Sequence, residues 1–250
     1  MHVEASVGYP GCMNTTATVC ESDISAVGAL LADPARATIL LALLGGTAVP
    51  AGELARQAGV SAATASAHLA RLLAAGWVEG EQQGRQRHYR LTSPDVARLL
   101  EHSACLAPLR PVRSLRGQQR LAALRQARSC YDHLAGQVGV ALTEALVRQG
   151  ALQVGEADFV LTSRGAAFLR DRGVAVPASG QRRAVARRCL DWSERRHHLA
   201  GALGAAVFAH WEAQGWIVRQ ATSRAVSLSA SGIAQLPRWG IDWPLGAPDA

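Results

Sequence analysis

The sequence contains no lysine, and all 26 of its basic residues are arginine. It also lacks a run of about eighteen apolar residues, and the apolar stretch ATILLALLG is too short to cross a bilayer. No basic stretch followed by an apolar one stands near the N-terminus, which argues against a secretory signal. We therefore predict a soluble, cytoplasmic protein without membrane contact.

The cysteines do not form the pattern of a disulfide framework. They are odd in number, widely spaced and include no CxxC pair, so reduced thiols in a reducing compartment are expected. The five are Cys12, Cys20, Cys105, Cys130 and Cys189.

The common catalytic motifs are also missing from the sequence. It has no glycine-rich phosphate loop, no nucleophile elbow and no HExxH pattern. We therefore expect no enzymatic activity. The one catalytic alternative is a nucleophilic Cys130 or Cys189 with a nearby His and Asp, in an enzyme fused to a DNA-binding domain.

What the sequence does contain is a surplus of positive charge. A net charge of +7 and a pI near 9.9 favour an anionic partner such as nucleic acid. The exclusive use of arginine carries no functional weight, because codon bias also produces it. Residues 109–128 hold six arginines and no acidic residue, and they either extend the positive surface or form a solvated helix.

Residues 22–107 carry the pattern of a helix-turn-helix with a wing. Apolar spacing and capping residues predict helices over residues 34–44, Pro50 to Ala58, and Ser61 to about Ala75, with a glycine turn between the last two. After Gly76 the apolar period becomes two, which predicts a β-hairpin. A further helix is expected from Pro94 to about Ala107.

Three stretches of this region resemble the ArsR/SmtB winged-helix repressors: LADPARATILLALL, ELARQAGVSAATASAHLARLLAAGWV and GRQRHYRLT. The resemblance covers residues 22–105. It implies a homodimeric transcriptional regulator, usually a repressor that an inducer releases from DNA. The metal sites usual in that family are not matched here. ELARQAG has no Cys, and the last helix has unmatched spacings of Asp95, Glu101, His102 and Cys105.

The candidate DNA contacts lie on the helix that begins at Ser61 and on the wing. Short side chains let the helix backbone sit deep in a major groove, and Ser or Thr can reach phosphates or base edges. Wing arginines suit backbone or minor-groove contacts. For His68, a phosphate contact and a partly buried position beside the wing are equal alternatives. The candidates are Ser61, Ala62, Thr64, Ser66, His68, Arg71, Arg85, Arg87 and His88.

The remainder of the chain contains an internal repeat. HLAGQVGVALTEALVRQGAL aligns with HLAGALGAAVFAHWEAQGWI, and each copy continues into a short strand and a helix. The DNA-binding unit has the same ending after Gly76, where the copies have Gly150 and Gly215. We therefore predict a mainly α fold with small β-hairpin wings, in which a winged helix-turn-helix domain precedes two degenerate winged-helix-like repeats.

The predicted domain boundaries follow from these patterns. We expect a flexible N-terminal tail over residues 1–21, the DNA-binding domain over 22–107 and an Arg-rich linker or helix over 108–127. The first C-terminal repeat spans 128–176, and the second repeat with the C-terminal tail spans 177–250.

Each C-terminal repeat opens on a cluster of Cys, Asp and His. The first reads CYDHLAG, and the second reads CLDWSERRHHLAG, with six residues inserted. Two facing half-sites of this kind would offer sulfur and nitrogen ligands to a zinc-like ion. On an unbroken helix, however, Cys189 would share a face with His197 and not with His198, which argues against a symmetric site. The candidate effector or metal residues are Cys130, Asp132, His133, Cys189, Asp191, His197 and His198.

Several interpretations of this cluster remain open at the level of sequence. It is a structural signature with buried cysteines and Asp–Arg pairs, an effector pocket for a metal ion or an organic ligand, or a thiol redox sensor. The expected function is a homodimeric, sequence-specific DNA-binding regulator, a repressor released by an effector that the C-terminal region senses. The alternative is a regulator whose C-terminal half serves only dimerisation or partner binding.

Overall fold

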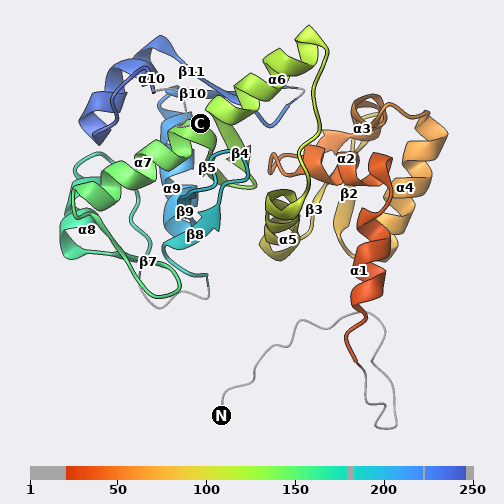
Figure 1. Cartoon of the computed structure of the whole chain (residues 1–250), viewed down its shortest axis with the longest axis horizontal. Helices are drawn as coiled ribbons and strands as arrows, with labels where there is room; N and C mark the ends of the chain where they lie inside the picture. The colour runs from red at the N-terminus through yellow and green to blue at the C-terminus, as the bar shows by residue number, and fades with distance from the viewer. Residues whose placement is uncertain (1–20, 179–182, 222, 246–250) are drawn as a thin grey trace.

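The computed structural model describes residues 21–178, 183–221 and 223–245. The predicted N-terminal tail therefore lies outside the described residues, apart from Glu21. Figure 1 shows α1–α5 gathered on one side of the molecule and α7–α10 on the other, with α6 running between them. Within the described residues, no single helix is long and apolar enough to span a membrane, and the bent pair of α1 and α2 reaches that length and composition only when both are taken together.

The N-terminal half is a winged helix-turn-helix, as the sequence predicted. Its strands form a three-stranded sheet in the order β1-β3-β2, and the β2–β3 wing pairs Val78 with Leu91 at its base and Gln83 with Gln86 at its tip. The elements are α1 (Ile24–Leu31), α2 (Pro34–Leu43), β1 (Val49–Pro50), α3 (Ala51–Ala58), α4 (Ala62–Ala74), β2 (Val78–Gln83), β3 (Gln86–Leu91) and α5 (Pro94–Leu106).

Local sequence accounts for these boundaries. The Asp33 carboxylate accepts a hydrogen bond from the Arg36 backbone N–H, and Pro34 follows in the first turn of α2. Gly59, with φ of 68°, ends α3 in the left-handed conformation that favours glycine. Leu54 of α3 and Leu69 of α4 lie in one buried hydrophobic core.

The C-terminal half repeats one order of elements. A short hairpin is followed by a helix of 13 residues, a second short hairpin and a shorter helix, in both segments. The first segment contains β4 (Arg128–Cys130), β5 (His133–Ala135), α7 (Gly136–Arg148), β6 (Leu152–Val154), β7 (Phe159–Leu161) and α8 (Ser163–Arg170). The second contains β8 (Arg187–Leu190), β9 (His197–Ala200), α9 (Gly201–Ala213), β10 (Ile217–Arg219), β11 (Val226–Leu228) and α10 (Ala230–Gln235), followed by a 3-10 turn, η1 (Leu236–Trp239). Helix α6 (Leu115–Gln126) lies in the predicted Arg-rich segment.

The ends of α4, α7 and α9 share one backbone geometry. Gly76, Gly150 and Gly215 follow these helices with φ of 69°, 70° and 66°. In each case the next residue donates a backbone hydrogen bond into the last turn of the helix, as Trp77 does to Leu72. The winged helix and the two C-terminal segments therefore turn from helix to hairpin in the same way.

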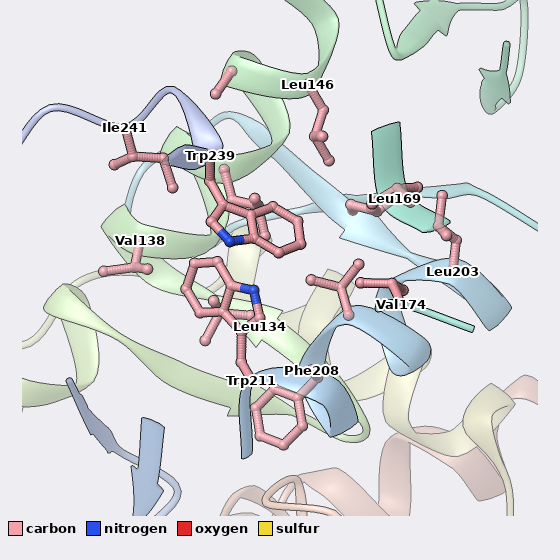
Figure 2. Close-up of a cluster of buried hydrophobic side chains, with 14 of the residues drawn as sticks. Leu134, Val138, Leu146, Leu169, Val174, Leu203, Phe208, Trp211, Trp239 and Ile241 are labelled. Atoms are coloured by element: carbon pink, nitrogen blue, oxygen red, sulfur yellow. The ribbon is translucent and has the colours of Figure 1, made fainter. Parts of the chain in front are cut away.

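Both C-terminal segments contribute to a single core. Figure 2 shows the indole rings of Trp211 and Trp239 next to each other. Their ring centroids are 5.3 Å apart, and the ring planes meet at 70°. Leu134 and Val138 from the first segment pack in the same cluster. Because the two segments bury their apolar faces against each other, the hairpins at their starts are brought together.

Several contacts hold the C-terminal half against the winged helix, among them a backbone hydrogen bond and a buried ion pair. The Tyr131 backbone N–H, between β4 and β5, donates to the Leu44 carbonyl at 2.6 Å. The Tyr131 carbonyl in turn lies so close to Gly46 that a Cβ there would overlap it. On the other side, Arg224 forms an ion pair with the fully buried Glu101 of α5.

The Gly46 contact yields a stability prediction. Gly46 has φ of 73° and no room for a Cβ, whereas Gly59 has φ of 68° and nothing in the described part of the chain within 4 Å of its Cβ position. Gly59→Ala should cost about 1–2 kcal/mol for the left-handed backbone alone. Gly46→Ala should cost more, because the junction must also move apart. Urea unfolding followed by tryptophan fluorescence measures both, and equal losses would contradict the tight junction.

Candidate functional site

The exposed face of α4 carries the predicted DNA-contacting side chains. Ser61 caps the helix, since its hydroxyl accepts from the Thr64 backbone N–H at 3.1 Å, and it also hydrogen-bonds the Thr64 hydroxyl at 2.9 Å. The predicted residues of this helix that are exposed are Ser61, Ala62, Thr64, Ser66 and Arg71. Most side chains on this surface are short, which lets the helix backbone approach a DNA groove closely.

His68 does not belong to that face. It is 9% exposed, its Nδ1 lies 3.4 Å from the Arg36 guanidinium and its Nε2 lies 3.6 Å from Asp33. The ring therefore lies against the start of α2, and this burial favours the second of the two predicted roles, a partly buried position. The phosphate contact of His68 stays a prediction.

The wing carries two exposed arginines near its tip. Arg85 and Arg87 are exposed next to Gly84, and the Arg87 guanidinium lies 5.6 Å from the centre of the Tyr89 ring. Arg90 differs, because it forms an ion pair with Glu79 at 2.6 Å. His88 is only partly exposed, since its strand lies between β1 and β2.

The Cys/His cluster is built on β-hairpins and not on helices. Cys130 faces His133 across the β4–β5 pair, and Cys189 faces His198 across the β8–β9 pair. The six inserted residues form a turn that Asp191 closes through hydrogen bonds with Arg195 and Arg196. The helical expectation that separated Cys189 from His198 is therefore wrong, and so is the argument against a symmetric site.

His197 is excluded from the cluster by the same geometry. It pairs with Leu190, one position along the β8–β9 register, and its side chain is exposed. Successive residues of a strand point to opposite faces, so His197 and His198 diverge. The prediction that His197 shares a face with Cys189 is not supported.

The four remaining side chains converge at one buried point. The Sγ atoms of Cys130 and Cys189 are 3.9 Å apart, and the Nε2 atoms of the two histidines are 3.2 Å apart. One ligand atom from each residue lies within 4.8 Å of all the others. The four residues, Cys130, His133, Cys189 and His198, are all buried.

Each histidine is held by a carboxylate on its other nitrogen. His133 Nδ1 hydrogen-bonds Asp132 at 3.2 Å, and His198 Nδ1 lies 3.1 Å from Asp191. Asp191 is fully buried and also forms an ion pair with Arg128 at 2.9 Å. These contacts orient both Nε2 atoms toward the centre of the cluster.

The electrostatics of the cluster follow from burial and from these partners. The neighbouring Cys189 thiol and burial hold the pKa of Cys130 far above its ordinary value. Burial disfavours the charged form of His198, but the contacts with Asp191 and Cys130 outweigh it and raise the pKa of His198 to about 9. Cys130 is therefore a neutral thiol at physiological pH, which is unfavourable for a nucleophile or an oxidant sensor.

Comparison with known proteins identifies the chain. A helix-turn-helix domain family model matches residues 31–81. The HTH-type transcriptional regulator YdfF of Bacillus subtilis is 44% identical over 211 residues, which is 84% of this chain and 93% of YdfF. The chain belongs to the HTH-type transcriptional regulators. It is a DNA-binding protein whose N-terminal segment is of the ArsR/SmtB winged-helix type.

A second curated relative and a solved structure match only that segment of the regulator. The HTH-type transcriptional regulator CmtR of Mycobacterium tuberculosis is 40% identical over 85 residues, 34% of this chain and 71% of CmtR. The NMR structure of the cadmium metal sensor CmtR from M. tuberculosis aligns with a TM-score of 0.29 and 32% identity, over 36% of this chain and 98% of that one.

A cavity of about 790 Å³ opens over the cluster of this regulator. Its wall includes the ligand-bearing hairpins, with Cys130, Cys189 and His133, as well as α5, with Arg98 and His102. The buried cluster can therefore be reached from the junction between the winged helix and the C-terminal half.

Sequence reasoning missed the contacts that link the hairpins to the winged helix. The Cys105 thiol of α5 donates to the Leu190 carbonyl at 3.6 Å, and Arg195 donates to the Cys105 carbonyl. No sequence signal marks Leu190 or Tyr131 for this role, because both act through backbone atoms. Cys12 and Cys20 lie outside the described residues.

The burial of His68 leads to a prediction. His68→Ala should lower the stability of the regulator by about 1–3 kcal/mol, because the buried Arg36 loses a polar neighbour. The DNA affinity of this variant should change little under conditions in which it stays folded. Ser66→Ala, on the exposed face of the same helix, should show the reverse pattern. Thermal melts and operator-binding titrations separate the two effects, and a large affinity loss in folded His68→Ala would support the phosphate contact.

Proposed function

We propose that the protein is a homodimeric repressor that leaves its operator when an effector binds at the Cys/His cluster. The observation that carries this proposal is the direct link between the cluster and the winged helix. Tyr131, next to Cys130, is hydrogen-bonded to Leu44, and Leu190, next to Cys189, is hydrogen-bonded to Cys105 of α5. A change in the ligand hairpins could therefore be passed to the end of α2 and to α5 of the DNA-binding unit.

The proposed DNA interface consists of the exposed α4 face and the wing tip. In a dimer, two copies of α4 would enter successive major grooves about 34 Å apart and read a roughly palindromic site. Ser61, Ala62, Thr64 and Ser66 would lie against the groove, with Arg71, Arg85 and Arg87 at phosphates. We assign His88 a supporting role behind the wing tip, because it is partly buried.

The proposed dimer contact involves the exposed apolar side chains around α5 and α6. Leu106 and Leu109 are each 87% exposed, and Leu115 is 72% exposed. Large apolar side chains grouped along one connection favour burial against a second copy of the chain.

The C-terminal half is proposed to be a pair of degenerate winged-helix-like repeats, over residues 128–176 and 177–250, joined to the DNA-binding domain by the Arg-rich linker 108–127. Their matching element order and helix ends support this duplication. In this arrangement the repeats bind the effector and no longer read DNA. The effector class that the cluster favours is a metal ion, because its donor atoms are sulfur and nitrogen.

The mechanism requires only that the effector prefers one of two states. If the DNA-bound and DNA-free arrangements hold the two ligand hairpins differently, an effector that favours the DNA-free arrangement lowers operator affinity. The protein would act in the cytoplasm, where it meets chromosomal DNA.

The proposed wing contacts predict a change in salt dependence. Arg85→Ala with Arg87→Ala should weaken binding to every DNA sequence and reduce the slope of log affinity against log salt by up to about 0.9 per lost phosphate contact. Arg90→Ala is the matched control in the same hairpin, because Arg90 is already paired with Glu79. Fluorescence anisotropy across a salt series measures the slopes. An unchanged slope in the double variant would overturn the wing assignment.

A further inference from the structure

We propose that Cys130, His133, Cys189 and His198 form one tetrahedral site for a closed-shell, thiophilic metal ion such as Zn²⁺, complete within each chain. Metal binding itself stands apart from the function proposed above. Only the consequence for DNA depends on that function.

The distances within the cluster match those between the ligands of such an ion. With Zn–S bonds of about 2.3 Å and Zn–N bonds of about 2.0–2.1 Å, a tetrahedron places its two sulfurs about 3.8 Å apart and its two nitrogens about 3.3 Å apart. The Sγ atoms of Cys130 and Cys189 are 3.9 Å apart, and the histidine Nε2 atoms are 3.2 Å apart. Two of the six distances between ligand atoms therefore already match a tetrahedral site, and the other four lie within 4.8 Å.

The orientation of the histidines supports the same conclusion. Asp132 and Asp191 lie on the Nδ1 side of His133 and His198, at 3.2 and 3.1 Å. A carboxylate on one imidazole nitrogen is the usual support for a histidine whose other nitrogen binds a metal. Without an ion, a proton on one Nε2 can join the two nitrogens in a hydrogen bond at 3.2 Å, and a metal ion would take the place of that proton.

Packing between the two C-terminal segments brings these ligands together. Helix α9 contacts β5, and α7 contacts β9, so each long helix packs on the hairpin of the other segment. The Cβ position of Gly204 in α9 lies 3.2 Å from the His133 Cβ, and that of Gly139 in α7 lies 3.7 Å from the His198 Cβ. Glycine at these two positions lets the histidine of each segment approach the helix of the other.

The donor set selects the class of ion. Two thiols and two imidazoles favour Zn²⁺, Cd²⁺ or Cu⁺ over Mg²⁺ and Ca²⁺, which prefer oxygen ligands. Four protein ligands also complete a tetrahedron without an open position, as in metal sites that hold structure and do not catalyse. Binding would release the thiol protons, and the ion would join the β4–β5 hairpin to the β8–β9 hairpin.

This connection gives the ion a route to the winged helix. The first hairpin is anchored at Leu44 through Tyr131, and the second is anchored at Cys105 through Leu190. An ion that joins the hairpins thereby also joins the end of α2 to α5.

The first experiment uses the full-length protein, purified anaerobically and freed of metal with a chelator. Titration with Zn²⁺ and with Co²⁺ should give one ion per chain by native mass spectrometry, and Co²⁺ should produce the visible absorption of a tetrahedral thiolate complex. Cys130→Ser with Cys189→Ser should abolish both signals. His197→Ala should leave both unchanged, because that neighbouring histidine points away from the cluster.

Two results would overturn the site. One is a wild-type protein that takes up no stoichiometric ion, and the other is full binding in the folded double variant. X-ray absorption of the zinc-loaded wild type gives a check that needs no variant. Two sulfurs at about 2.3 Å and two nitrogens at about 2.0–2.1 Å are expected, and a shell of nitrogen and oxygen alone would exclude the site.

A DNA titration with and without Zn²⁺ separates the site from the proposed function. For a metal effector, Zn²⁺ should change operator affinity by about 5- to 150-fold in the wild type and not in the double variant. Stoichiometric binding with unchanged DNA affinity would support the metal site and overturn its role as effector site. An equal response in the double variant would overturn the site as the origin of the signal.

Discussion

The ion pair between Arg128 and Asp191 is the interaction on which the C-terminal half depends. Both side chains are fully buried, so their loss of hydration must be offset by other contacts. The Asp191 carboxylate also accepts from the Gly136 N–H at the start of α7, contacts His198, and accepts from the backbone N–H groups of Ser193 and Glu194 in the β8–β9 turn. One carboxylate thereby joins both ligand hairpins to the first long helix. Removing Asp191 would leave the charge of Arg128 buried without its carboxylate partner, which is more costly than losing a surface pair.

The winged helix was predictable because its signals are local. Asp33-Pro34, Gly59 and Ser61 each fix the start or end of one helix through contacts within a few residues. The exposed face of α4 follows from the same periodicity. The burial of His68 does not, because it depends on how α2 brings Arg36 beside α4. Helical periodicity indicates which residues share a face but not which partner covers them.

The cluster was predicted in its residues but not in its geometry. Cys130 and His133 are three positions apart. This spacing fits one turn of a helix and a tight hairpin equally well. The hairpin forms because Tyr131 takes a positive φ of 61°, and the Leu44 carbonyl holds its N–H in place. That contact spans two domains, so no pattern within CYDHLAG reveals it. The inserted turn after Asp191 is stabilised in the same way, by Arg128 from the other segment.

Both ligand hairpins belong to a single chain, so ligand binding at the cluster and DNA binding by a dimer differ in how they depend on protein concentration. All four side chains of the cluster are supplied by one polypeptide, so their meeting is an intramolecular event. Occupancy of the cluster then depends on the concentration of the ligand and not on how many copies of the protein the cell contains. Operator binding by the proposed dimer would depend on the concentration of the protein as well. Under the proposed function, the effector could therefore bind at protein levels too low for a dimer to form, and the two subunits could be occupied one at a time.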